Sequence, residues 1–194
     1  MSGLSYAQER LWFLDRLEPG SSEYVVSRAL SLRGALDREA LERALAEVVA
    51  RHEVLRTWVE VVDGKPLLRV DAAAAQLDLP CTDLRELPRD EAWARARAAV
   101  EEQGSRTFDL ARSPLVRAAL IRLGDEEHVL CVSMHHIVTD GWSLGLLGTE
   151  LGALYGAFAR GEQDHERGGA LIGRERVEAV GHGPRHGEVE GGAA

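Results

Sequence analysis

Two adjacent histidines, His135 and His136, are followed by Asp140 and Gly141 in the stretch MHHIVTDGWS. Imidazole exchanges protons near neutral pH, an aspartate can fix a loop or hold an arginine, and a glycine lets a ligand approach the backbone closely. A histidine beside the free N–H groups of a helix start is suited to acyl transfer. The imidazole takes a proton from an attacking amine or alcohol, and the N–H groups stabilise the developing oxyanion.

Adjacent side chains of a strand point to opposite faces, so one histidine is expected to face the site while the other supports it. Two other interpretations of the histidine pair are a zinc site and a purely structural role. A zinc site would need one histidine, Asp140 and a third ligand from elsewhere, and no His-x-x-x-His or cysteine pair lies nearby, so we expect no metal. The structural interpretation is that His136 only ends a strand and hydrogen-bonds a loop.

The elements around the pair follow from the pattern of apolar residues. Residues 127–134 are predicted to form a strand in which VLCVSM, residues 129–134, is apolar on both faces, as is typical of a buried central strand. This strand is expected to pair with residues 115–124 through a turn at Gly124 and Asp125. Residues 143–158 predict an amphipathic helix. The histidines therefore lie in a loop between a buried strand and a helix start, where open α/β sheets commonly bind ligands.

The preceding elements each carry a local signal, and the predicted order is α-β-α-β-β-α-β-β-α. They are a helix over 4–17 with a Ser5–Gln8 capping box, a strand over 24–34, a helix over 36–56 with Asp37 as N-cap, a hairpin over 57–71 around Asp63-Gly64 in which Pro66 indicates an edge strand, and a helix over 90–104 that stops at Gly104.

Composition narrows the function classes. The chain has 194 residues, 45% of them hydrophobic, and a formal net charge of -9, which disfavours nucleic acid and anionic membranes as partners. No basic leader or membrane-length apolar run is present, so we expect a cytoplasmic location. No aromatic residue follows Phe158, and residues 161–194 are expected to form a disordered tail rich in Gly, Arg and Glu.

Three motifs together resemble one family. HHIVTDG is similar to the His-His-x-x-x-Asp-Gly signature of the chloramphenicol-acetyltransferase-like acyltransferases. SYAQERLWFLDRLEPGSSEY and RHEVLRTWV resemble the first two motifs of condensation domains of non-ribosomal peptide synthetases, over roughly residues 3–160. The resemblance implies an α/β fold, an α+β two-layer sandwich in which helices pack on a mixed sheet. Residues 1–160 would be the N-terminal subdomain of such a domain.

The resemblance also implies a reaction and its residues. The reaction is condensation between carrier-bound aminoacyl thioesters, with no cofactor bound directly and the substrates presented on the 4'-phosphopantetheine of carrier proteins. His136 would be the active-site histidine, as base or as positioner of the amine, Asp140 would hold the loop through an arginine, and Gly141 would lie near the donor thioester. The supporting residues would be His135, Arg56 as a structural anchor, Trp142 and Ser143.

The chain departs from the family pattern in length. Condensation domains have two similar halves, so we expect a truncated half-domain, with carrier proteins and a complementary C-terminal half as partners. A second interpretation is a non-catalytic fragment or docking module that keeps the fold. A third is an acyltransferase with the same signature that acts on an alcohol.

Overall fold

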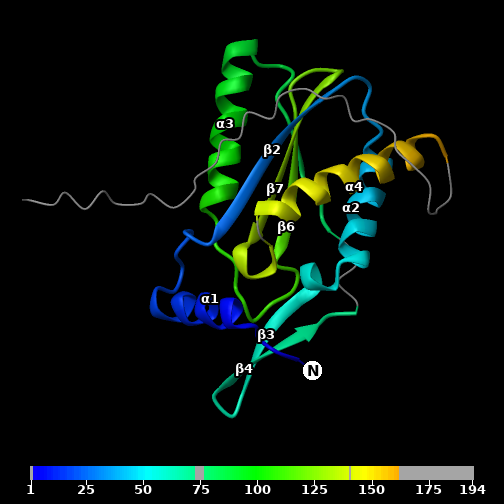
Figure 1. Ribbon diagram of the computed structural model, residues 1–194. Coiled ribbons are helices and arrows are strands. Elements are labelled where there is room, and N and C mark those ends of the chain that lie inside the picture. The colour runs from blue at the N-terminus through cyan, green and yellow to red at the C-terminus, as the bar shows by residue number, and fades with distance from the viewer. Residues whose placement is uncertain (1, 73–76, 140, 162–194) are drawn as a thin grey trace, which may run out of the picture.

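The computed structural model describes residues 2–72, 77–139 and 141–161. A four-stranded sheet with the order β2-β7-β6-β5 runs through it (Figure 1). Its strands are β2 (Val25–Arg33), β5 (Cys81–Asp83), β6 (Val116–Arg122) and β7 (Glu127–His135). β7 is antiparallel to both of its neighbours, whereas β5 is parallel to β6. The expected mixed sheet and its buried central strand are confirmed.

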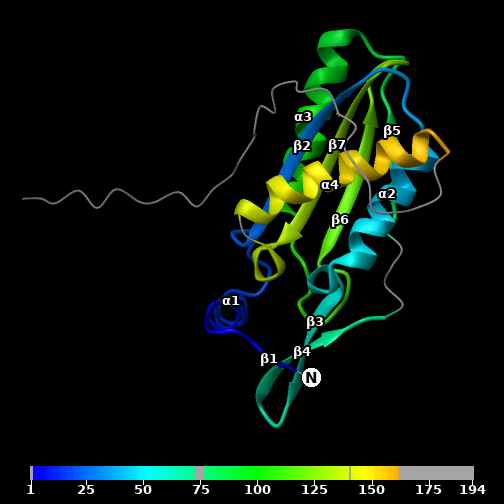
Figure 2. The same cartoon turned by 45° about the vertical axis from the view of Figure 1, so that its right-hand side comes forward.

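Helices cover both faces of this sheet, with α3 on one face and α2 and α4 on the other (Figure 2). The helices are α2 (Arg38–Arg51), α3 (Arg89–Ser105) and α4 (Gly141–Ala159). Side chains of β7 alternate between the faces: Val129 and Cys131 pack in the cluster with α3, and Leu130 and Met134 pack in the cluster with α2. Burial of these side chains on both faces fixes the position of β7.

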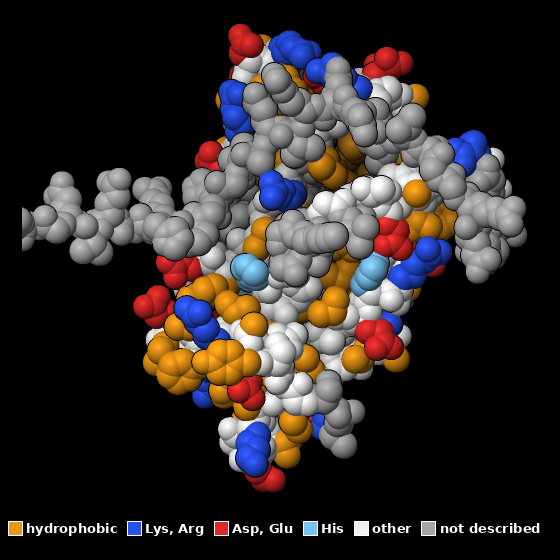
Figure 3. Space-filling view, in the orientation of Figure 1, with side chains coloured by type: hydrophobic (Ala, Val, Ile, Leu, Met, Phe, Trp, Pro, Cys, Tyr) orange, Lys and Arg blue, Asp and Glu red, His pale blue; other side chains and the backbone are white. Residues whose placement is uncertain are grey.

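Two helix starts have the predicted caps. At α1 (Tyr6–Leu17), the Ser5 hydroxyl accepts from the Gln8 N–H at 3.3 Å, and Gln8 Oε1 accepts from the Ser5 N–H at 3.0 Å. At α2, the Asp37 carboxylate accepts from the Ala40 N–H at 3.0 Å. Both predictions are confirmed. α1 has no buried residue, and Figure 3 shows apolar side chains exposed on it.

A second, three-stranded sheet contains the predicted hairpin. Its strands, in the order β1-β4-β3, are β1 (Ser2–Gly3), β4 (Lys65–Val70) and β3 (Thr57–Val62). Asp63 and Gly64 form the turn with φ of 50° and 75°, as a two-residue hairpin turn requires. The prediction that Pro66 marks an edge strand is wrong, because β4 lies between β1 and β3. Proline is tolerated there because β1 pairs only with Leu67 and Leu68.

The end of α3 also corrects the sequence prediction. The helix does not stop at Gly104 but continues to Ser105, with Arg106 as its C-cap. A Cβ added at Gly104 would lie 3.4 Å from the Ser27 hydroxyl oxygen of β2. This is an ordinary van der Waals separation, so Gly104 is an interior residue of α3 that faces β2 and does not end the helix.

The remaining elements are short. Strands β1 and β5, and the 3-10 turns η1 (Glu53–Arg56) and η2 (His136–Val138), have too few residues to produce a periodic pattern and were not predicted. Of the tail expected over 161–194, everything from 162 onward lies outside the described residues. Within the described part of the chain, none of the helices has the length and apolar character needed to span a bilayer.

Candidate active site

The histidine pair lies where the central strand ends. His135 is the last residue of β7 and pairs with Val25 of β2, and His136 begins the turn η2. The His136 N–H donates to the Tyr24 carbonyl at 2.7 Å, so the turn stays attached to the start of β2. The backbone of α4 begins at Gly141, soon after this turn. The predicted sequence of buried strand, loop and helix is present.

His135 is a buried, neutral hydrogen-bond acceptor. The residue is 2% exposed, and its Nδ1 accepts from the Ile137 N–H at 3.1 Å. Burial, and to a smaller extent the neighbouring His136, lowers the pKa of His135 to about 4. Because Nδ1 accepts a hydrogen bond, the single proton of the neutral ring lies on Nε2. His135 therefore supports the turn without carrying a charge at neutral pH.

His136 is exposed, in contrast to its neighbour. Figure 3 shows histidine side chains at the surface of the face that carries α4. The sequence predicted both histidines in the loop after the strand, but β7 includes His135, and only His136 lies in the turn beyond it. The two rings therefore have different surroundings for two reasons: side chains alternate between the faces of a strand, and the strand ends between the two histidines. An exposed imidazole here is accessible to a substrate.

The remaining residues of the predicted loop are placed only in part. Asp140 lies outside the described residues, so its expected role in holding the loop stays a prediction. Gly141, Trp142 and Ser143 form the first turn of α4. The first N–H groups of a helix have no partner within the helix, so this turn can offer donors to an anion or oxyanion.

Arg56 is the last residue of η1, and its side chain contacts the end of α2. Its guanidinium donates to the carbonyls of Val49 at 3.1 Å, Ala50 at 3.0 Å and Asp71 at 2.9 Å. Val49 and Ala50 belong to the last turn of α2, whose carbonyls lack partners within the helix. These contacts join the helix end to the segment after β4, and the role of Arg56 as a structural anchor, which they favour, stays a prediction.

Three residues of the site region had no functional signal in the sequence. Gln8 Nε2 donates to the Ile137 carbonyl at 3.2 Å, although Gln8 was interpreted only as part of a capping box. Tyr24 accepts from the backbone of His136 through its carbonyl, which any residue type could do. His52, in the second motif, contacts Glu150 of α4 with 2.6 Å between Nε2 and Oε2. Each contact joins segments far apart in the chain.

The described residues contain no candidate set of metal ligands. Among residues 2–72, 77–139 and 141–161, no group of three or more His, Cys, Asp or Glu side chains could hold a metal ion. The described residues of the loop offer an exposed imidazole, a buried neutral imidazole and the backbone N–H groups of a helix start.

The comparisons with known proteins identify the family. The family model of the condensation domain matches residues 1–167. The chain is 46% identical over 159 residues to a linear gramicidin synthase from Brevibacillus parabrevis, and the match covers 82% of this chain and 3% of that protein. It is 44% identical over 158 residues to phosphinothricin tripeptide synthetase PhsC of Streptomyces viridochromogenes, and the match covers 81% of this chain and 14% of that protein.

Solved structures that are similar to this chain are also condensation domains. The first condensation domain of the calcium-dependent antibiotic synthetase, solved with a substrate analogue, has a TM-score of 0.76 and 28% identity over 83% of this chain and 38% of that one. The starter condensation domain of rhizomide synthetase has a TM-score of 0.78 and 24% identity over 85% of this chain and 39% of that one, and it supports the fold. The chain belongs to the condensation-domain family. It spans only a small part of the curated relatives and well under half of the solved domains.

Proposed function

We propose that this chain carries the histidine-bearing part of a site that joins a donor aminoacyl thioester to an acceptor amine, both presented on the 4'-phosphopantetheine of carrier proteins. The observation that carries the proposal is the contrast between the two histidines: His136 is exposed at the turn before α4, and His135 is buried behind it. Membership of the condensation family and the similarity to peptide synthetases support the class of reaction.

In this reaction the acceptor nitrogen attacks the thioester carbonyl, a C–N bond forms and the C–S bond breaks. His136 either takes the proton that the amine loses or positions the amine for attack, and the sulfur leaves as a thiol once it receives a proton. N–H groups in the first turn of α4 are suitable donors for the oxyanion formed in between. The partners proposed are the two carrier proteins and the part of the domain that this chain does not span.

The test is dipeptide formation from donor-loaded and acceptor-loaded carrier proteins. The purified chain is assayed with and without the C-terminal part of a related condensation domain, and each product is measured by mass spectrometry. We expect dipeptide only when both parts are present, because orientation of two bound substrates supplies much of the rate. Acylation of an added alcohol but not of the amine would instead support the alcohol acyltransferase. Absence of any acyl transfer by a folded, demonstrated complex would support a docking module.

A further inference from the structure

The side chain of Gln8 joins the first helix to the histidine turn. Its Nε2 donates to the Ile137 carbonyl at 3.2 Å, and its Oε1 accepts from the Ser5 N–H at 3.0 Å. Gln8 and Ile137 are 129 positions apart in the sequence. One amide group therefore serves both the start of α1 and the turn that carries His136.

Ile137 is held at both of its backbone polar groups by side chains. Its N–H donates to His135 Nδ1 at 3.1 Å, its carbonyl accepts from Gln8, and the residue is only 3% exposed. On the other side of the reacting histidine, the His136 N–H donates to the Tyr24 carbonyl at 2.7 Å. Hydrogen bonds therefore fix the backbone on both sides of the position that carries the His136 side chain. Of the three bonds, only the one from Gln8 links this turn to α1.

We propose that Gln8 is a positioning residue for His136, acting through the Ile137 carbonyl and controlling the direction in which the imidazole leaves the turn. The proposal rests on the proposed role of His136. A small displacement of a reacting group can cost a large factor in rate, so one hydrogen bond at this carbonyl can affect turnover without touching the substrate. The amide of glutamine is required because the carbonyl needs a donor, whereas the capping box needs only an acceptor.

That difference provides matched variants. Gln8→Glu keeps an acceptor for the Ser5 N–H, as in a common capping box, but loses the donor to Ile137. Ser5→Ala removes the hydroxyl that caps the Gln8 N–H and leaves both bonds of the Gln8 side chain in place. Gln8→Lys keeps a donor and lacks an acceptor. The first variant thus tests the link to the turn, the second tests the helix cap, and the third tests rescue by a donor.

The first measurement is amide hydrogen exchange on the chain itself, followed by NMR. Loss of one hydrogen bond predicts that the Ile137 and Thr139 amides exchange about two- to tenfold faster in Gln8→Glu, with no change in Ser5→Ala.

The second measurement is kinetics in the complemented dipeptide assay. We expect Gln8→Glu to lower kcat several-fold with KM for both carrier proteins unchanged, Gln8→Lys to restore part of kcat, and Ser5→Ala to lower Tm while kcat stays at its original value.

The two readouts separate failure of this proposal from failure of the proposed function. Unchanged Ile137 exchange in Gln8→Glu, or an equal loss of kcat in Ser5→Ala, would overturn the positioning role. Should Gln8→Glu not fold, Gln8→Met, which lacks both polar groups, is compared with Gln8→Lys, and equal kcat in these two would also overturn it. If exchange quickens as expected while His136→Ala leaves turnover intact, the link to the turn stands and the proposed function is wrong.

Discussion

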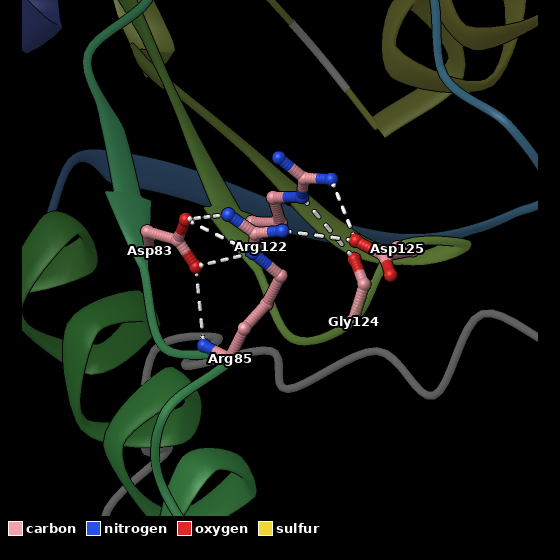
Figure 4. Close-up of polar contacts among 5 residues, drawn as sticks. All are labelled: Asp83, Arg85, Arg122, Gly124 and Asp125. Atoms are coloured by element: carbon pink, nitrogen blue, oxygen red, sulfur yellow. Dashed lines mark hydrogen bonds and ion pairs between the residues drawn. The ribbon is translucent and has the colours of Figure 1, made fainter.

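The two ends of the central strand β7 are held in different ways. At its start, exposed ion pairs join neighbouring segments: Arg85 contacts Asp83 and Asp125, and Arg122 contacts Asp125 at 2.9 Å (Figure 4). At its far end the histidine turn is held by uncharged groups, namely the buried ring of His135, the Gln8 amide and the Tyr24 carbonyl.

This difference indicates where the structure is sensitive to substitution. Exposed ion pairs gain little net free energy and are screened by salt, and the Asp125 side chain is 81% exposed. Loss of a buried hydrogen bond leaves a polar group without a partner, which costs more. We therefore expect substitutions at the turn to change activity or stability strongly, and substitutions in the ion-pair network to change them little.

The largest expected effect is that of His136→Ala on the rate. Removal of a general base typically lowers the rate ~10²–10⁴-fold, and because the side chain is exposed, the thermal unfolding midpoint should stay near that of the original chain. Single-turnover dipeptide formation in the complemented assay measures the rate, and circular dichroism measures the midpoint. A loss of less than threefold would place the chemistry elsewhere.

The second effect is a dependence of stability on pH that comes from His135. An unfolded histidine has a pKa of about 6.5. In the folded chain the pKa of His135 is about 4, so the unfolded state binds the proton first and stability is lost as the pH falls from the unfolded value toward the folded one. The full loss is on the order of 3 kcal/mol. Urea denaturation from pH 7 to pH 4 measures it.

The matched control is His135→Asn, which keeps an acceptor for the Ile137 N–H and does not titrate. Burial also lowers the pKa of His128, so part of the slope in the original chain belongs to that residue and should persist in the variant. The difference between the two slopes isolates His135. Identical slopes would mean that His135 does not stay neutral in the folded chain.

The third effect concerns Arg56. Arg56→Lys keeps the charge but cannot reach three carbonyls with a planar group, so it should lower the free energy of unfolding by on the order of 2 kcal/mol. Urea denaturation at pH 7 measures this change. A neighbouring control is Arg51→Lys, whose partners Glu47 and Glu150 accept a single charge equally well. Equal stability of the two variants would argue against the anchoring role.

The smallest effect is expected in the ion-pair network. Arg85→Ala removes contacts with Asp83 and Asp125, and these contacts are open to water, so the unfolding midpoint should shift less than in Arg56→Lys. What shift there is should shrink further when the salt concentration is raised. Thermal melts in low and high salt test this, and a large, salt-independent shift would contradict the comparison.

Much of the fold could be predicted from the sequence because its signals are local. Ser5, Asp37 and the Asp63-Gly64 turn each act within a few residues, and the apolar run at 129–134 is long enough to indicate a buried strand. Shorter elements were missed, since β5 has three residues and β1 has two. Gly104 was misassigned because a glycine near a helix end is a common stop signal, whereas α3 continues to Ser105.

The site could be predicted only in outline. The motif placed His135 and His136 at the end of a buried strand, but the end of that strand at His135 is not visible in the pattern. The contacts that hold the turn come from Gln8 and Tyr24, which belong to segments far from it in sequence. Such contacts depend on how the elements pack, so the residue types and spacing near the motif do not predict them.

The most direct test of the central claim, that a neutral buried histidine holds the turn beneath an exposed one, is the ¹⁵N NMR spectrum of the His135 ring in the purified chain at pH 7. The structure predicts an unprotonated Nδ1 that accepts the Ile137 N–H and a protonated Nε2, with this pattern persisting well below pH 6. A ring that is protonated on Nδ1, or charged at pH 7, would contradict it.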